Sequence, residues 1–62
     1  MDNNNVEIEV TIIRESDAAI LVRGNGVEAW LPKSLSFGFD SNNREPQTFE
    51  VPEFLAVEKG LV

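Results

Sequence analysis

The sequence predicts a small, mainly β domain: an antiparallel meander, or an SH3-like or OB-like barrel of four to five strands, with one short C-terminal helix. Three observations predict it. Residues 6–13 alternate apolar and polar side chains with a period of two. An Asn25-Gly26 pair, typical of a tight hairpin turn, separates two apolar runs. Residues 52–59 change to a helical pattern. An open three- or four-stranded sheet with the helix packed across one face fits the same observations.

The first strand is predicted over residues 6–13 because β-branched side chains dominate one side of the alternation. The expected inward side holds Val6, Ile8, Val10 and Ile12, and the outward side holds Glu7, Glu9 and Thr11. Residues 14–17 are polar and suit a short hairpin loop. We therefore expect the apolar run over 18–23 to return antiparallel to the first strand.

The second hairpin follows from the turn chemistry of Asn25 and Gly26, which both tolerate the positive φ of a type I′ turn. This turn places Arg23 opposite Glu28 and Leu21 opposite Trp30. Both are favourable cross-strand pairs. The third strand should bend or end at Pro32, which has no N–H for a ladder hydrogen bond.

Beyond Pro32, residues 33–37 are expected to continue in an extended conformation, with Leu35 and Phe37 on one side. The polar stretch 38–46 is predicted to be a mobile loop, and 47–51 a further short strand. The helix over 52–59 begins at Pro52 and is too short to persist without docking. We expect Phe54, Leu55 and Leu61 to pack on the sheet, with Leu61 folding back after Gly60 as in a Schellman motif.

The chain of 62 residues predicts a single domain over 1–62, with a disordered N-terminus over 1–5. It contains no Cys and no His, so we expect no disulfide, no metal site and no cofactor. A domain this small has a low free energy of unfolding, and association with partner subunits is one way to increase it.

Composition also reduces the number of function classes that fit the chain. Without His, Cys or Tyr, few side chains remain for acid–base or nucleophilic work, so we expect no catalytic residues and no enzyme. The net charge of −6 disfavours nucleic acid as a partner. Residues 1–5 lack the features of a signal peptide, and the longest apolar run, 18–22, is too short to cross a bilayer. A cytoplasmic protein with no membrane association is the resulting expectation.

The candidate contact surface is centred on Trp30. Its predicted side of the sheet also carries Leu21 and Ile13, and such an apolar patch rimmed by charges has the composition of a binding hot spot. The candidate partner-binding residues are Ile13, Leu21, Arg23, Glu28, Trp30, Lys33 and Phe39. In the competing interpretation the C-terminal helix covers this side and Trp30 belongs to a second core. Phe37 and Phe39 can form a recognition tip, or the last core residues of a hairpin.

The predicted partner is a protein, basic or itself nucleic-acid-binding, that meets the acidic surface; a homodimer would satisfy the apolar patch equally well. Glu7 and Glu9 share one side of a strand, and we read them as a solvated surface rather than a catalytic pair. One alternative is a single-strand nucleic-acid binder that stacks bases on Trp30, Phe37 or Phe39.

Two segments resemble small proteins encoded by bacteriophages and prophages. Residues 30–34 read W-L-P-K-S, and residues 51–61 read V-P-E-F-L-A-V-E-K-G-L. The resemblance covers most of 6–36 and 47–62, and departs at Phe54, where Trp is frequent in that group. It implies a bacterial cytoplasm during infection, where tiny acidic proteins act stoichiometrically as inhibitors or adaptors of larger host or phage proteins, anti-CRISPR proteins among them. A structural subunit of a phage assembly is a further alternative. The resemblance supplies no site residues.

Overall fold

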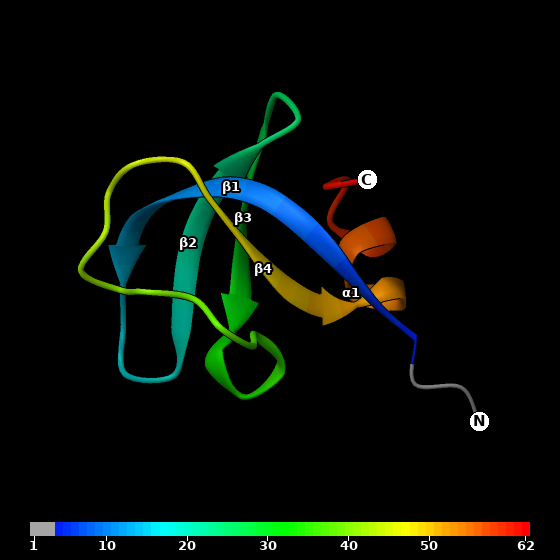
Figure 1. The fold of residues 1–62 in the computed structure, drawn as a ribbon, viewed down its shortest axis with the longest axis horizontal. Helices are drawn as coiled ribbons and strands as arrows, with labels where there is room; N and C mark the ends of the chain where they lie inside the picture. Colours follow the sequence, from blue (N-terminus) through cyan, green and yellow to red (C-terminus); the bar gives the residue numbers. More distant parts are fainter. Residues whose placement is uncertain (1–3) are drawn as a thin grey trace.

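A computed structural model describes residues 4–62 and shows one antiparallel sheet with the strand order β3-β2-β1-β4 (Figure 1). A single short helix follows the last strand, so the prediction of a mainly β domain with a C-terminal helix is confirmed. The strands number four and curl into a barrel-like shape. The elements are β1 (Asn5–Glu15), β2 (Ala19–Gly24), β3 (Val27–Pro32), the 3₁₀ turn η1 (Lys33–Leu35), β4 (Gln47–Pro52) and α1 (Glu53–Glu58).

Strand β1 belongs to both halves of the sheet. Its first part, from Asn5 to Val10, pairs with β4, and its second part, from Thr11 to Glu15, pairs with β2. The predicted alternation is confirmed: Ile8, Val10 and Ile12 are buried while Glu7 and Glu9 are exposed. Asn5 is the first residue of β1, and residues 1–3 of the predicted disordered N-terminus lie outside the described residues.

The predicted register of the second hairpin is confirmed at every pair. Arg23 lies opposite Glu28, and Leu21 lies opposite Trp30. Asn25 and Gly26 have φ values of 53° and 77°, as a type I′ turn requires. The turn residues therefore determine which side chains of β2 and β3 face each other.

Gly24, just before that turn, lies against β1 with no room for a side chain. A Cβ atom on Gly24 would lie 2.6 Å from Val10 Cγ1 and 3.0 Å from the Glu9 carbonyl oxygen. The second of these neighbours is backbone and cannot rotate away. Only glycine fits between the two strands here without displacing β1.

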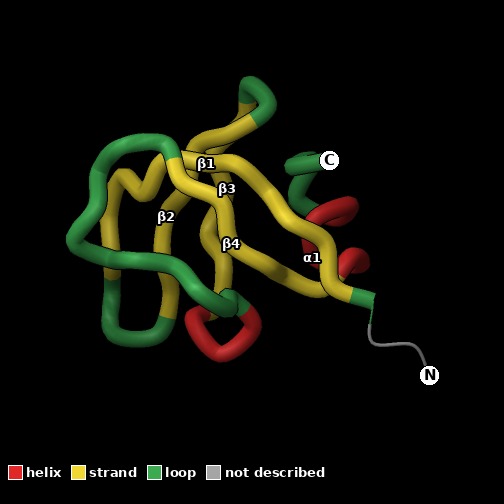
Figure 2. The backbone as a smooth tube through the Cα atoms, in the orientation of Figure 1, coloured by secondary structure: helices red, strands yellow, loops and turns green. Residues whose placement is uncertain are grey.

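The core lies between the concave side of the sheet and α1. Every strand contributes the side chains that point inward, and α1 contributes the side chains that face the sheet. The buried cluster consists of Ile8, Val10, Ile12, Ile20, Val22, Leu31, Phe49, Val51, Leu55, Ala56 and Leu61. Figure 2 shows α1 at the end of the sheet where β1 begins and β4 ends.

The chain does not stay extended after β3. The prediction of an extended segment over 33–37 was wrong, because residues Lys33–Leu35 form the 3₁₀ turn η1. Pro32 ends the pairing with β2, and the turn then redirects the chain toward β4, where Phe37 makes a single antiparallel bridge with Glu50. The buried Ser36 hydroxyl donates to the Pro32 carbonyl at 2.9 Å. This hydrogen bond stabilises the bend after Pro32.

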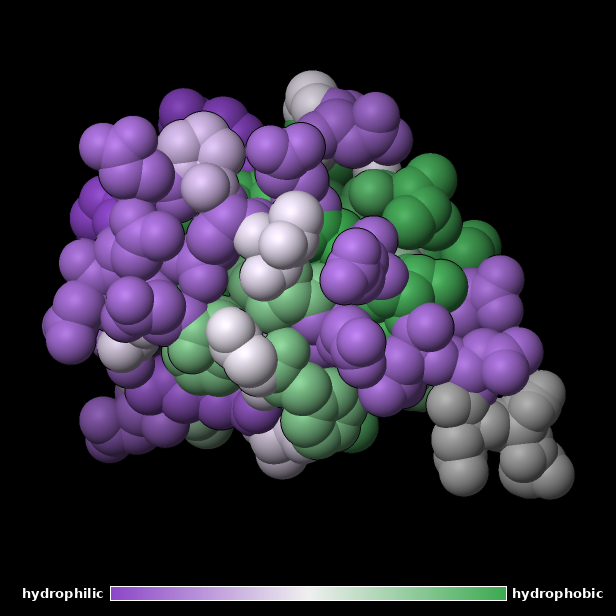
Figure 3. All heavy atoms as spheres, in the orientation of Figure 1, coloured by the Kyte–Doolittle hydropathy of each residue, from purple (hydrophilic) through white to green (hydrophobic). Residues whose placement is uncertain are grey.

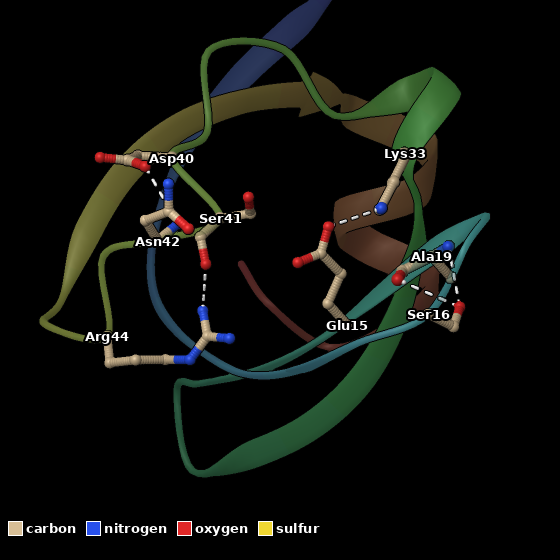
Figure 4. A network of polar contacts seen from close by, with 8 residues as sticks. All are labelled: Glu15, Ser16, Ala19, Lys33, Asp40, Ser41, Asn42 and Arg44. Atoms are coloured by element: carbon tan, nitrogen blue, oxygen red, sulfur yellow. Dashed lines mark hydrogen bonds and ion pairs between the residues drawn. The ribbon is translucent and has the colours of Figure 1, made fainter.

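Residues 38–46 contain no helix or strand, in agreement with a loop. Polar side chains organise its backbone: the Asn42 N–H donates to Asp40 Oδ1 at 3.0 Å, and Arg44 donates to the Ser41 carbonyl (Figure 4). The Gln47 side chain at the start of β4 accepts from the Asp40 N–H at 2.8 Å. The mobility of this loop stays a prediction.

The end of α1 follows the predicted Schellman pattern. The Leu61 N–H donates to the Ala56 carbonyl at 2.9 Å and the Gly60 N–H to the Val57 carbonyl at 3.1 Å. Gly60 has the left-handed φ of 75° that this ending needs. Leu55 and Leu61 are buried as expected, but the docking expected for Phe54 was wrong, because Phe54 is 64% exposed.

Candidate partner-binding surface

Trp30 lies on the outer side of the sheet and is 44% exposed. Its cross-strand neighbour Leu21 is half-buried, and both alternate with the core residues Leu31 and Val22. The helix α1 packs against β1 and β4, with Leu55 and Ala56 in the core. The interpretation in which α1 covers Trp30 to form a second core therefore does not hold.

Ile13 extends the apolar surface onto β1. The pairing of β1 with β2 shifts between Ile12 and Arg14, so that Ile13 is the extra residue of a bulge, and Leu21 lies opposite Arg14. Ile13 is half-buried and lies outside the core cluster. Ile13, Leu21 and Trp30 thus come from three adjacent strands, and we call them the Trp30 row.

An ion pair closes the Trp30 row on the side of the hairpin turn. Arg23 Nη2 lies 2.7 Å from Glu28 Oε2, and Arg23 Nε donates to the same oxygen at 3.0 Å. The two residues are direct cross-strand neighbours, as predicted. Their charges neutralise each other, so this end of the row carries little net charge.

Lys33 does not join the row. Its Nζ lies 2.6 Å from Glu15 Oε2, and Figure 4 shows the two side chains reaching toward each other from η1 and the end of β1. Both side chains are about one third exposed or less, at 29% for Lys33 and 33% for Glu15. The pair ties η1 to β1.

The two aromatic residues around Gly38 have different environments, and Phe39, a candidate partner-binding residue, is the one that packs inward. Phe39 packs against the core, with its ring centroid 5.8 Å from that of Phe49 at an angle of 60°. Phe37, for which the sequence left both a recognition tip and a core position open, is 46% exposed. Phe39 is therefore separated from the Trp30 row and supports the fold.

An acidic surface lies on the outer side of the β1–β4 pair. Glu7 lies directly opposite Glu50, and Glu9 follows Glu7 on the same side of β1. The ion pairs found in residues 4–62 involve other carboxylates. This surface is negative and uncompensated, consistent with its reading as a solvated face.

The structure has a second apolar surface that the sequence did not predict. Phe54 and Val57, on the outer side of α1, are 64% and 59% exposed. In a helix of six residues the neighbours Phe54, Leu55 and Ala56 are all apolar, so a helical period cannot tell which of them faces the sheet. Figure 3 shows apolar surface where α1 and the C-terminus lie.

The surface of the domain carries two apolar patches, the Trp30 row and the outer side of α1, and the acidic surface of the β1–β4 pair. The part of the chain that the structure describes contains no group of three metal-ligating side chains. It also contains no helix with the length and hydropathy to cross a bilayer. Buried side-chain polar atoms in residues 4–62 all have hydrogen-bond partners. Together these features define a small acidic β domain with apolar patches on its surface.

Comparison of the chain with known protein families, with curated proteins and with solved structures finds no match.

Proposed function

We propose that this protein is a non-enzymatic binding module that acts stoichiometrically on a protein partner through the Trp30 row. The observation that carries the proposal is the exposure of Trp30, 44%, on a side of the sheet that α1 leaves uncovered. The core is complete without Trp30. A large aromatic residue beside Leu21, with an ion pair at the rim, has the composition of an interface hot spot.

The charge supports a basic partner, such as a protein that itself holds nucleic acid. The formal net charge is −6, and Glu7, Glu9 and Glu50 gather on one side of the β1–β4 pair. Such a field accelerates encounter with a positive surface and disfavours association with a second, equally negative copy. Homodimerisation through the Trp30 row is the competing outcome.

The setting of this function is also a proposal. The resemblance of residues 30–34 and 51–61 to small phage and prophage proteins supports an inhibitor or adaptor that acts in the bacterial cytoplasm during infection, on a host or phage protein. An anti-defence role, anti-CRISPR activity included, belongs to the same class. A structural subunit of a phage assembly would instead form a symmetric oligomer without a host target.

Single-strand nucleic-acid binding is the less favoured alternative. It requires Arg23 and Lys33 to contact phosphates beside Trp30, yet these side chains are paired with Glu28 and Glu15. A labelled oligonucleotide at about 50 mM salt tests it, because phosphate contacts strengthen as salt is lowered. A salt-sensitive shift would favour this alternative over a protein partner.

The decisive experiment compares three baits in infected and uninfected bacterial extracts: the native chain, Trp30→Ala and Phe37→Ala. Phe37 is a matched control because it is an aromatic residue of similar exposure, 46%, outside the Trp30 row. We expect a partner retained by the native and Phe37→Ala chains and lost by Trp30→Ala. Light scattering of the purified chain reports the competing dimer. A monomer that retains no partner, or one that Trp30→Ala retains equally, would contradict the proposal.

A further inference from the structure

The exposed side of α1 has an apolar centre and acidic flanks. Successive helix residues are rotated by about 100°. Leu55 and Ala56 occupy the buried side. Around the exposed side the order is then Glu53, Val57, Phe54 and Glu58. We call Phe54 and Val57, together with these two flanking glutamates, the α1 ridge.

The apolar centre of the ridge does not contribute to the core. Leu55 and Ala56 hold α1 against β1 and β4, and neither Phe54 nor Val57 is part of the buried cluster. Their exposures, 64% and 59%, are larger than the 44% of Trp30. Burying an aromatic and a β-branched side chain that are already held in place by a docked helix costs little ordering entropy. The ridge is therefore suited to contact a partner.

The charges on the ridge indicate what kind of partner fits. Glu53 and Glu58 form no ion pair within residues 4–62. Lys59 ends the helix, half-buried, on the side away from them. Two copies of the chain that met at this ridge would bring glutamates against glutamates, and an anionic lipid surface would be repelled in the same way. Positive side chains around a small apolar contact complement it.

We propose that the α1 ridge is a second docking surface, which binds a protein segment in which Lys or Arg residues flank one or two apolar side chains. It is independent of the Trp30 row, because Leu21 and Trp30 lie on β2 and β3 while α1 packs on β1 and β4. A chain with two separate contact surfaces can hold two partners, or two parts of one partner.

The test titrates the ¹⁵N-labelled full chain with a synthetic peptide that has a pair of Leu residues flanked by Lys, and maps the amides that shift by NMR. Two further peptides replace the Leu residues by Ser, or the Lys residues by Glu. The same titration is repeated with Phe54→Ser/Val57→Ser, which removes the apolar centre, with Glu53→Gln/Glu58→Gln, which removes the flanking charge, and with Trp30→Ser as the matched control. Thermal melts confirm that each variant is folded.

We expect the Lys/Leu peptide to shift the amides of α1, and its affinity to fall about tenfold in Phe54→Ser/Val57→Ser. Glu53→Gln/Glu58→Gln should reduce the affinity severalfold and weaken its salt dependence, while Trp30→Ser should leave it unchanged. Equal binding of the Lys/Ser peptide, or shifts that centre on the β1–β4 acidic surface or on the Trp30 row, would overturn the proposal. Because Trp30→Ser alters only the Trp30 row, this control distinguishes a failure of the α1 ridge from a failure of the proposed function.

Discussion

Glu7 lies directly opposite Glu50 across β1 and β4, with both side chains exposed on the outer side of the sheet. Like charges in this position destabilise a sheet. No basic side chain lies within ion-pair distance of either one in the described part of the chain. This arrangement lowers the stability of the chain and leaves a negative surface exposed on the β1–β4 pair.

Glu50→Lys should therefore stabilise the fold, by about 0.5 kcal/mol at low salt, because it converts a cross-strand repulsion into an attraction. Urea unfolding followed by circular dichroism measures the change, and added salt should reduce it. Glu50→Gln, which removes the repulsion alone, should give a smaller gain. A loss of stability in both variants would show that the Glu7–Glu50 repulsion is negligible.

Gly24→Ala should destabilise the protein by about 1–3 kcal/mol, the usual cost of forcing an extra methyl group into a packed site. The new Cβ would meet Val10 Cγ1 at 2.6 Å and the Glu9 carbonyl at 3.0 Å. Gly26→Asn in the adjacent turn is the control, since no atom lies within 4 Å of a Cβ there and Asn tolerates positive φ. Equal stability of the two variants in urea unfolding would contradict a close approach at Gly24.

Trp30→Ala and Leu31→Ala, at neighbouring positions, should differ sharply. Leu31 is fully buried, and its truncation should cost about 2–5 kcal/mol. Trp30→Ala should cost about 1 kcal/mol or less, because the side chain is 44% exposed and lies outside the core. Thermal unfolding followed by circular dichroism compares them. A comparable loss at both positions would place Trp30 in a second core and remove the basis of the proposed contact surface.

Asn25→Gly tests the tie between the hairpin turn and the end of α1. Asn25 Nδ2 donates to the Gly60 carbonyl at 3.0 Å, and Gly keeps the positive φ while deleting this donor. We expect a loss of about 0.5–1.5 kcal/mol. Amide hydrogen exchange of residues 55–61 should accelerate, with that of β1 and β4 less affected. Unchanged exchange in α1 would mean that this hydrogen bond does not hold the helix end.

The hairpins could be predicted from sequence because they depend on local chemistry. Two residues, Asn25 and Gly26, determine the register of β2 and β3, and the alternation around Glu7 and Glu9 determines which side of β1 is buried. The Schellman ending at Gly60 is equally local. These features need no knowledge of the tertiary structure.

The remaining features depend on contacts between distant segments. Whether the chain turns at Lys33 depends on where β4 lies, and which of Phe37 and Phe39 packs against the core depends on Phe49. The exposure of Phe54 depends on how α1 meets β1 and β4. The bulge at Ile13 likewise has no local signature. Of the predicted site residues, Leu21 and Trp30 are cross-strand neighbours in the structure, and Ile13 lies on the next strand. Lys33 and Phe39, which were predicted to lie beside them, contact Glu15 and Phe49 instead.

The pairing of β1 with both β2 and β4 has a consequence for when the chain folds during synthesis. Strand β1 finds its β4 partners only after β2, β3 and the loop over 38–46, so a fragment that stops before β4 lacks the complete sheet. A nascent polypeptide can form the β2–β3 hairpin while synthesis continues, but the pairing of β1 with β4 closes a long loop and must wait until β4 has emerged. Folding should thus be an all-or-none event that waits for β4, and until β4 pairs, the apolar side of β1 stays open to chaperones and proteases.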